Sequence, residues 1–188
     1  MKGIIFNLLE ERVEGEGGPA AWDDLLDSAE VDGGYSAIGD YPTGELASLV
    51  GARARVLDCS ELDALRDFGH GALLSLAGKF PAFFTPHERT RDFLLTLNDV
   101  IHPQVRKLHA SARPPEFDFT VIGDDQLRMV YRSDRQLCGM AEGMIAGAAT
   151  HFGQHVEIVQ DQCVLAGADA CVLHCTFHDR ADDAAAGA

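Results

Sequence analysis

Basic residues are scarce in this chain of 188 residues, which has 15 Lys and Arg against 30 Asp and Glu and a formal net charge of −15. A surface that binds nucleic acid is built from clustered Lys and Arg, so the composition argues against a nucleic-acid partner. The same acidic balance disfavours anionic membranes. We therefore expect neither nucleic acid nor a membrane among the partners.

Long apolar runs are also missing. The apolar stretch from Ile4 to Leu9 is too short for the hydrophobic segment of a signal peptide, and Glu10 and Glu11 follow it at once. No other stretch approaches the roughly 20 apolar residues that span a bilayer. We expect a cytoplasmic protein.

The five cysteines include no C-x-x-C pair. An odd number of cysteines without a secretion signal does not indicate a disulfide framework. The cysteines are therefore interpreted either as reduced thiols or as ligands of a metal site.

The order of the hydrophobic patterns predicts an α+β fold, in which an N-terminal helical part is followed by an antiparallel sheet with further helices. Pro19 suits the first position of a helix that contains Trp22, and residues 46–50 form a second apolar segment. Ser60 and Asp63 resemble a capping box that opens a longer helix.

A further helix is predicted after Thr90, and it carries His102. Pro103 removes a backbone donor directly after this histidine, so we expect a kink there rather than a break. The period then changes to that of strands. The pattern predicts a hairpin, a helix and a second hairpin over residues 117–131, 137–150 and 156–177.

We expect residues 1–180 to form a single domain, because a chain of this length suffices for one sizeable core. Residues 1–60 would make up its helical N-terminal part, and residues 61–180 the helix with His102 and the sheet. Residues 181–188 are small, acidic and unpatterned, which predicts a flexible tail.

Tyr131, Ser133 and Arg135 alternate at the end of a predicted strand. Side chains two residues apart on a strand point to one face, so the three can converge on one ligand. A guanidinium beside two hydroxyls suits carboxylates or phosphates. We expect an anionic ligand here, while the same spacing also describes an ordinary exposed strand end.

His102 lies in a mainly apolar helix upstream of that motif. A histidine among apolar residues is more often a hydrogen-bonded core residue than a ligand. Combined with an anionic site, however, it points to haem. The iron takes an imidazole as its proximal ligand, and the two propionates need a cationic, hydroxyl-rich anchor.

With these motifs the sequence resembles the H-NOX family of haem-nitric oxide/oxygen binding domains, which includes stand-alone bacterial sensors and the haem domain of soluble guanylate cyclase. Four stretches carry the resemblance over nearly the whole chain. They are Met1-Lys2-Gly3-Ile4-Ile5-Phe6-Asn7, the His102 helix with Pro114-Pro115, Tyr131-x-Ser133-x-Arg135, and Cys138-Gly139-Met140-Ala141-Glu142-Gly143.

The resemblance implies a role for each of these residues. His102 would bind the iron of haem b through one imidazole nitrogen, and the Tyr131-x-Ser133-x-Arg135 motif would hold the propionates. The haem would lie between the helical part and the sheet. Pro115 resembles the family proline that presses on the porphyrin and keeps it out of plane, a role that Pro114 could share.

The distal pocket, where the gas binds, is expected to be apolar. Relatives that hold oxygen use a tyrosine on the helix after the motif, whose hydrogen bond is worth roughly 1.5–3 kcal/mol, whereas this chain has Met140 there. The resemblance therefore implies nitric oxide, with carbon monoxide as a further ligand, although Tyr35 remains a potential donor. Other candidates for the lining, each equally well explained as core, are Ile4, Ile5, Leu8, Leu9, Leu74 and Met144.

Cys138, Cys163 and Cys171 are candidates for a second site, since some bacterial members of the family carry zinc bound by Cys and His in this region. Cys175 lies about 13 Å from Cys171 along one strand, at ~3.3 Å per residue, too far for thiolates on one tetrahedral zinc. Three buried free thiols are the competing interpretation. The fourth ligand is left open among His151, His155, His174 and Cys175.

Taken together, the sequence predicts a stand-alone nitric oxide sensor rather than an enzyme. Binding of NO opposite His102 would weaken the iron–histidine bond, freeing the helix from Thr90 to Leu108 and letting the haem relax against Pro115. Relatives act on histidine kinases of two-component signalling, cyclic-di-GMP enzymes or chemoreceptors, so we expect a separate partner of this kind. The alternatives are an oxygen sensor, a zinc-thiol redox sensor and a haem enzyme.

Overall fold

The computed structural model describes residues 1–179 and has the predicted α+β fold. The first helices are α1 (Gly3–Gly17), α2 (Pro19–Ala29), α3 (Thr43–Leu57) and α4 (Glu61–Lys79). The next elements are η1 (Pro81–Phe83), α5 (Thr90–Leu94), η2 (Leu97–Ile101) and α6 (His102–Leu108). The last are β1 (Glu116–Gly123), β2 (Gln126–Arg132), α7 (Cys138–His151), β3 (Gln154–Gln162), η3 (Val164–Ala166) and β4 (Cys171–Asp179). The tail predicted for residues 181–188 lies outside the described residues.

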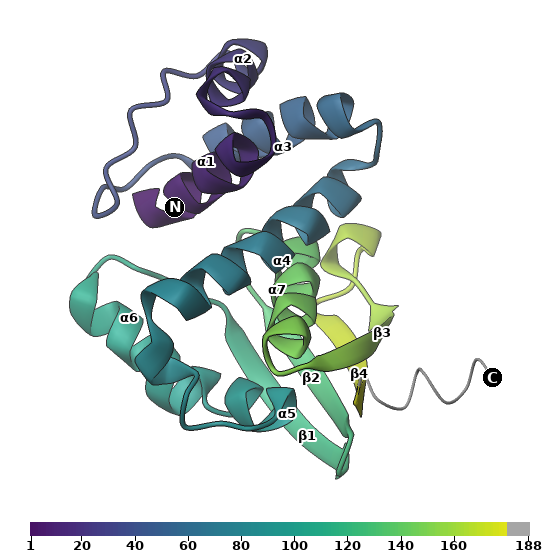
Figure 1. Ribbon diagram of the computed structural model, residues 1–188. Helices are drawn as coiled ribbons and strands as arrows, with labels where there is room; N and C mark the ends of the chain where they lie inside the picture. The colour runs from purple at the N-terminus through teal and green to yellow at the C-terminus, as the bar shows by residue number, and fades with distance from the viewer. Residues whose placement is uncertain (180–188) are drawn as a thin grey trace, which may run out of the picture.

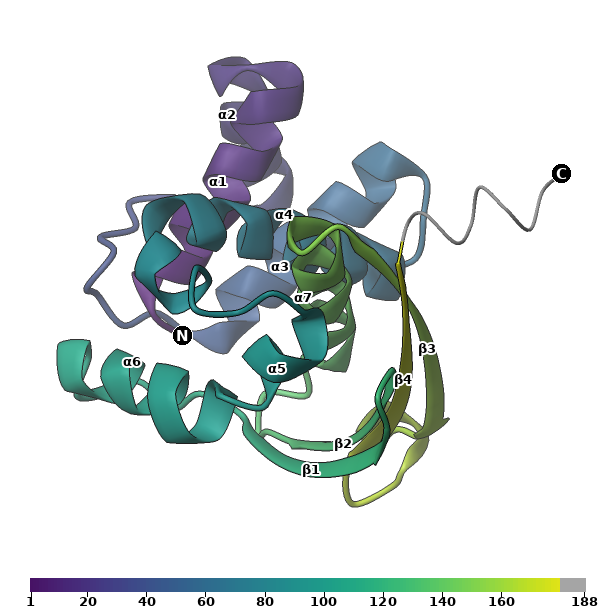
Figure 2. The ribbon, with the colours of Figure 1, turned by 60° about the horizontal axis from the view of Figure 1, so that its bottom comes forward.

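The strands form one antiparallel sheet in the order β1-β2-β4-β3. Both predicted hairpins are present, since β1 pairs with β2 and β3 with β4. The central pairing joins β2 to β4 and sets Met129 opposite Leu173. Figure 2 shows the sheet curving around α7, which lies on its concave face.

The helices α1, α2 and α3 form a layer of their own, and α4 runs between this layer and the rest of the molecule (Figure 1). One apolar core lies among α1 to α4 around Phe6 and Phe68, both 0% exposed. The other lies between α7 and the sheet around Met129 and Leu173. Met140 of α7 belongs to the first core, so α7 contributes to both.

The start of α4 has the predicted N-cap, while the carboxylate of Asp63 accepts from the hydroxyl of Ser60 and not from its backbone N–H. Ser60 is the N-cap, and its Oγ accepts a hydrogen bond from the backbone N–H of Asp63 at 3.1 Å. At 19 residues α4 is a long helix. Within residues 1–179, however, none of the helices combines the length and the apolar composition needed to cross a bilayer.

Helices α4 and α7 approach closely because glycines stand at their contact. A Cβ added at Gly143 would lie 2.1 Å from the carbonyl oxygen of Arg66, and one at Gly69 would lie 2.3 Å from that of Met140. Larger residues would push the two backbones apart. This contact joins the N-terminal helices to the sheet and sets the position of the α7 side chains.

An ion-pair network links α1, α3 and α4. Arg53 is 4% exposed, and its Nη2 lies 2.7 Å from Asp67 Oδ2 and 2.9 Å from Glu16 Oε2. Asp67 also accepts from Arg12 at 2.6 Å. Burial alone would raise the pKa of Asp67, but the two guanidinium groups outweigh it and lower that pKa below its usual value.

The predicted helix from Thr90 to Leu108 is divided into three pieces. Residues 95 and 96 separate α5 from η2, and η2 is a π-helix in which the N–H of His102 donates to the carbonyl of Leu97. Pro103 then lies in the first turn of α6, where a missing N–H is tolerated. The expected kink at Pro103 thus takes the form of a change in helical register.

Candidate functional site

A cavity of about 330 Å³ lies where the N-terminal helices meet the sheet and α6. This volume falls within the roughly 300–1,000 Å³ that is typical of ligand and cofactor sites. Its walls come from α1, α4, α5, η2, α6, β1, β2 and α7. Both parts of the fold therefore contribute to one site.

His102 opens α6 and lines this cavity. Its Nδ1 is buried without a hydrogen-bond partner, so it is not the satisfied core histidine that the sequence left as an alternative. Burial first, and the nearby Arg106 second, lower the pKa of the imidazole to about 4. The ring is therefore neutral near pH 7, which is the form that binds a metal ion.

Phe117 packs beside His102, and two prolines line the same cavity. The ring of Phe117 lies 6.1 Å from the imidazole, with 26° between the planes. Pro114 and Pro115 line the cavity directly before β1 begins at Glu116. The fixed φ of proline stiffens this connection, as a residue that presses on a flat ligand requires.

Tyr131, Ser133 and Arg135 all line the cavity. The strand alternation that we expected to bring them together is wrong, because β2 ends at Arg132 and the last two residues lie in the following turn. This turn is closed by the N–H of Arg135, which donates to Ser133 Oγ at 3.3 Å. A turn, and not a pleated strand, thus produces the predicted convergence.

This end of the cavity gathers donors and cations. Burial raises the pKa of Tyr131, while its hydrogen bond with Ser133 acts in the opposite direction, so its hydroxyl stays protonated near pH 7. The guanidinium of Arg135 donates to the carbonyl of Arg113. Arg113 and Lys2 also line the cavity. Carboxylates of a bound ligand would find charge-assisted partners here.

Most of the predicted apolar residues line the cavity, but Leu9 and Leu74 do not. Leu9 is fully buried in the core of the N-terminal helices, and Leu73 lines the cavity in place of its neighbour Leu74. Consecutive side chains of a helix point about 100° apart, and here the direction of Leu73, not that of Leu74, leads to the cavity. The predicted residues that do line it are Ile4, Ile5, Leu8, Met140 and Met144.

Sequence reasoning misses one wall of the cavity. Four phenylalanines between α4 and α6 line it, and so does one face of η2 and α6. The signal for that face was the helical spacing of its apolar residues around His102. The missed residues are Phe80, Phe83, Phe84, Phe93, Leu97, Ile101, Val105 and Leu108.

Neither Tyr35 nor Tyr41 is among the residues that line the cavity. The hydroxyl of Tyr35 donates to Glu45 Oε2 at 2.9 Å, and that of Tyr41 donates to the carbonyl of Gly34 at 3.1 Å. On the walls formed by α1, α4 and α7, the lining residues are all apolar. They are Ile4, Ile5, Leu8, Leu73, Leu76, Met140, Ala141, Met144 and Ile145.

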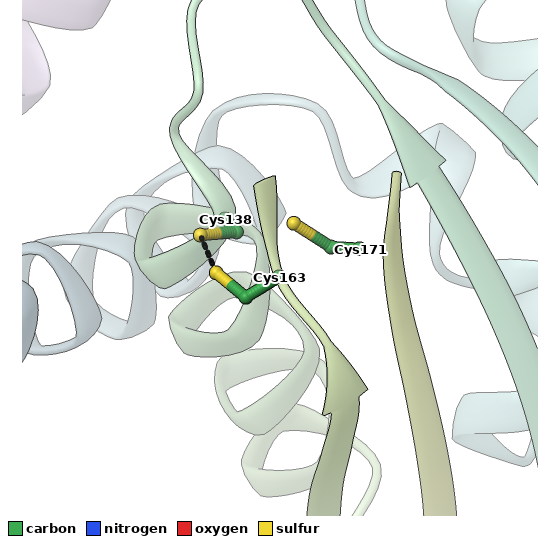
Figure 3. A group of neighbouring side chains, drawn as sticks. All are labelled: Cys138, Cys163 and Cys171. Carbon is green, nitrogen blue, oxygen red and sulfur yellow. Dashed lines mark hydrogen bonds between the residues drawn. The ribbon is translucent and has the colours of Figure 1, made fainter. Parts of the chain in front are cut away.

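Three cysteines form a second candidate site at one end of the sheet (Figure 3). Cys138 begins α7, Cys163 follows β3 and Cys171 begins β4. Their Sγ atoms lie within 4.8 Å of one another, and those of Cys138 and Cys163 are 3.7 Å apart. Thiolates at 2.3 Å from a tetrahedral zinc stand about 3.8 Å apart, so the three sulfurs suit three corners of such a site.

The three thiols differ in acidity. Burial, followed by the contact with Cys163, raises the pKa of Cys138 to about 12, and burial also raises the pKa of Cys171. Burial acts in the same direction on Cys163, but backbone N–H groups of Leu165 and Ala166 and the neighbouring thiols outweigh it and lower the pKa of Cys163. Cys163 is therefore the thiol of this group that ionises first.

Within residues 1–179, none of the four residues considered as a fourth ligand joins this group. Each has other neighbours. His174 Nε2 lies 2.8 Å from Asp161 Oδ2, His155 stacks on His178, His151 packs against Phe84, and Cys175 Sγ lies 3.9 Å from Met129 Sδ. The structure thus brings together the three predicted thiols and none of the residues considered as a fourth ligand.

The cavity fits the predicted haem. It offers a neutral imidazole with an unpartnered nitrogen, apolar walls on three helices, and a cationic end with hydroxyl donors. These are the groups that an iron porphyrin with two propionates requires.

Comparisons with known proteins agree with this arrangement. The sequence model of the family described as Haem-NO-binding matches residues 2–160. The crystal structure of an H-NOX protein from S. oneidensis in the Fe(II)NO ligation state is 32% identical over 95% of this chain and 100% of its own, with a TM-score of 0.88. No curated protein matches the chain.

Two further solved structures share the fold. The H-NOX domain from Shewanella oneidensis in the Fe(II)CO ligation state is 33% identical over 95% of this chain and 99% of its own, with a TM-score of 0.85. The unliganded Fe(II) H-NOX protein from K. algicida is 24% identical over 96% of this chain and 98% of its own, with a TM-score of 0.83.

Proposed function

The chain belongs to the haem-NO-binding (H-NOX) family of haem-binding gas-sensor domains, and we propose that it binds nitric oxide at ferrous haem b and signals to a separate partner. His102 would hold the iron, to which the gas binds. The Tyr131-x-Ser133-x-Arg135 segment would hold the propionates, and Pro115 would press on the macrocycle. The observation that carries this proposal is the neutral, unpartnered imidazole of His102 in the same cavity as the cationic end.

The gas preference follows from the walls of the cavity. Bound oxygen takes on negative charge and gains roughly 1.5–3 kcal/mol from a hydrogen-bond donor. The walls from α1, α4 and α7 supply none, and the hydroxyl of Tyr35 is engaged by Glu45. A pocket of this kind favours nitric oxide and carbon monoxide over oxygen.

Of the two helices beside His102, α5 is held to the rest of the protein by side-chain hydrogen bonds and α6, within residues 1–179, is not, as a conformational switch would require. Arg91 of α5 donates to the carbonyls of Gly123 and Asp124 at 3.1 and 2.8 Å. Within the described residues, by contrast, no side chain of α6 makes a hydrogen bond or ion pair, and none is fully buried. Release of His102 would therefore free α6 while α5 stays fixed.

Movement of α6 has a direct connection to the N-terminal helices. Ser111, which follows α6, donates to Asp40 Oδ2 at 2.7 Å, and Lys2 contacts the same oxygen at 2.9 Å. A shift of α6 would pull on this contact and change the surface between the two parts of the fold. We propose that a histidine kinase, a cyclic-di-GMP enzyme or a chemoreceptor reads this change.

The three cysteines support a second sensing function, which responds to oxidation of a zinc site. Cys138, Cys163 and Cys171 have the spacing of three zinc ligands, and the N–H of Val164 donates to Cys171 Sγ at 3.4 Å, as backbone groups do to bound thiolates. A zinc here would pin β3 and β4 to the start of α7, which follows the propionate segment. Oxidation of the thiols would then change the same part of the protein as the gas does.

One optical experiment tests the gas proposal. The reduced protein should keep its absorption spectrum in air, change with carbon monoxide, and change with nitric oxide to a spectrum without histidine coordination. A stable oxygen complex would favour the oxygen sensor, and steady turnover of peroxide would favour a haem enzyme. Either result would contradict the proposal.

A matched pair of variants tests the role of His102. His102→Gly should keep its fold but bind haem weakly unless imidazole is supplied, because the propionate contacts remain while the bond to iron is lost. His109→Gly is the control, since His109 also lines the cavity. Full haem occupancy in His102→Gly without imidazole, or loss of haem in His109→Gly, would mean that His102 is not the iron ligand.

A further inference from the structure

The turn before His102 combines two helical registers. The carbonyl of Thr96 accepts the N–H of Val100 at 2.9 Å, as in an α-helix, and the N–H of Ile101 at 3.1 Å, as in a π-helix. The N–H of His102 then donates to the carbonyl of Leu97, so the π register continues through η2. Both registers meet at one carbonyl, and a contact from outside the segment can therefore decide between them.

The register of η2 sets the direction of His102. A π-turn contains one residue more than an α-turn, and successive side chains of a helix point about 100° apart. A continuous α-helix from Thr96 onward would therefore turn the side chains of α6 by about this angle around its axis. With the π-turn in place, His102 and Val105 lie on the face of α6 that lines the cavity. The π-turn thus decides which face of α6 meets the cavity.

Asn98 joins this turn to the sheet. Because β1 is an edge strand, part of its backbone has no neighbouring strand with which to pair. The carbonyl of Phe117 in β1 instead accepts a hydrogen bond from Nδ2 of Asn98 at 2.5 Å. Within residues 1–179, no other side chain of η2 makes a hydrogen bond or an ion pair. The anchor therefore acts on the π-turn itself.

The same residue of β1 also contacts His102. The ring of Phe117 lies 6.1 Å from the imidazole, with 26° between the two planes. Phe117 is 7% exposed and belongs to the core between α7 and the sheet, so its position is set by the packing around it. One buried residue therefore holds the turn through its backbone and contacts the imidazole through its side chain.

We propose that Asn98 is a positioning residue for His102. Its hydrogen bond to the carbonyl of Phe117 holds η2 in the π-helical register, and this register directs the imidazole into the cavity, beside the ring of Phe117. The inference rests on the proposed function of His102 as the iron ligand and names the contact that orients it. Loss of a group that orients a metal ligand typically lowers metal affinity by about 10- to 100-fold.

Asn98→Ala removes the hydrogen bond and tests the proposal in the reduced haem protein. The iron–histidine stretching band of the resonance Raman spectrum should broaden and move to lower frequency, because an imidazole without a fixed direction bonds the iron less well. Transfer of haem to apomyoglobin should be about 10- to 100-fold faster. Asn98→Leu keeps the shape of the side chain without its donor and should give the same changes. Asp99→Ala is the control, since Asp99 is the next residue of η2 and is exposed, and it should leave both measurements unchanged.

NMR spectra of the full chain without haem separate this inference from the proposed function. In the original chain, a scalar coupling across the hydrogen bond should link the N–H of His102 to the carbonyl of Leu97. The rings of His102 and Phe117 should also show nuclear Overhauser contacts. Both signals should be lost in Asn98→Leu and kept in Asp99→Ala, and circular dichroism verifies that the two variants keep the fold.

The two measurements give distinct outcomes. If the original chain shows no iron–histidine band but Asn98→Leu loses both NMR signals, the proposed function falls and the role of Asn98 stands. If the band is present and the Asn98 variants change neither the band nor the NMR signals, the role of Asn98 is refuted. It is refuted as well if the NMR signals are lost while the band stays unchanged, because the imidazole then does not depend on the turn.

Discussion

The imidazole of His102 lies beside the ring of Phe117, with 6.1 Å between the centroids and 26° between the planes. The carbonyl of Phe117 also accepts the hydrogen bond from Asn98. One residue of β1 therefore contacts both the histidine and the helical turn before it. The sheet thus contacts both the imidazole that α6 carries and the helical turn from which α6 starts.

Arg135→Ala should accelerate haem loss by roughly 10- to 100-fold, the equivalent of one charge-assisted hydrogen bond. Ser133→Ala should have a smaller effect, because a hydroxyl makes a weaker bond. Transfer of haem to apomyoglobin measures both rates. Arg132→Ala is the matched control, since this neighbouring arginine pairs with Asp118 and is not among the lining residues. If the transfer rate is unchanged in both Arg135→Ala and Ser133→Ala, these residues do not bind the propionates.

The site residues could be predicted where residue type carries the chemistry. His102 and Arg135 were predicted as ligands because few side chains can bind iron or paired carboxylates, and both line the cavity. The mechanism that brings Ser133 and Arg135 into the cavity was not found, because a short turn and a strand end can place the same residues together. Alternation is a property of regular strands, and it stops where the strand stops.

The apolar lining could be predicted only in part, for a physical reason. Ile4, Ile5, Leu8 and Leu9 all lie in α1 and are all apolar, so no periodicity distinguishes the wall of a cavity from the core. The position of α1 against α4 and α7 decides that Leu9 is core. The π-helix before His102 was likewise not predictable, since Pro103 indicates a disturbance and not its form.

Met140→Tyr should give the protein a measurable affinity for oxygen. Met140 is 7% exposed and lines an apolar wall, so a hydroxyl at this position would enter the cavity as its missing donor. A hydrogen bond to bound oxygen would raise the affinity by roughly 10- to 100-fold. Absorption spectra of the reduced protein in air would show the complex. Met140→Phe supplies the ring without the hydroxyl, and oxygen binding by both variants would attribute the effect to shape.

Gly143→Ala should destabilise the protein by about 1–3 kcal/mol, because its new Cβ would collide with the carbonyl of Arg66 across the contact of α4 and α7. Gly78→Ala is the matched control. A Cβ at Gly78 meets nothing within 4 Å, so alanine there should be neutral or slightly stabilising. Urea unfolding gives both values. Equal stability of the two variants would mean that the helices can separate without cost.

Asp67→Asn should lower stability near pH 7 by roughly 1.5–3 kcal/mol, because the buried Arg53 loses one of its two carboxylate partners and keeps Glu16. The folded state lowers the pKa of Asp67, so its contribution is present above the ordinary value of 3.8 and is lost as the pH falls through the folded pKa. The difference between the original chain and Asp67→Asn should therefore shrink in acid. Thermal unfolding at pH 7 and pH 3 measures it, with the exposed Asp24→Asn as control.

The last prediction concerns zinc binding by the three clustered cysteines. If Cys138, Cys163 and Cys171 hold zinc, reduced protein should contain about one zinc per chain in addition to haem iron, with water or a small ligand in the fourth position. Cys163→Ser should remove the metal, because this residue has the lowered pKa and supplies the first thiolate. Cys59→Ser should not, since Cys59 is exposed and lies outside the group. Peroxide should release the zinc as it oxidises two of the thiolates to a disulfide. Metal analysis before and after oxidation measures the zinc content. A low zinc content in reduced protein, or a zinc content that Cys163→Ser does not change, would mean that the three residues are core thiols. The gas would then be the single signal that the protein senses.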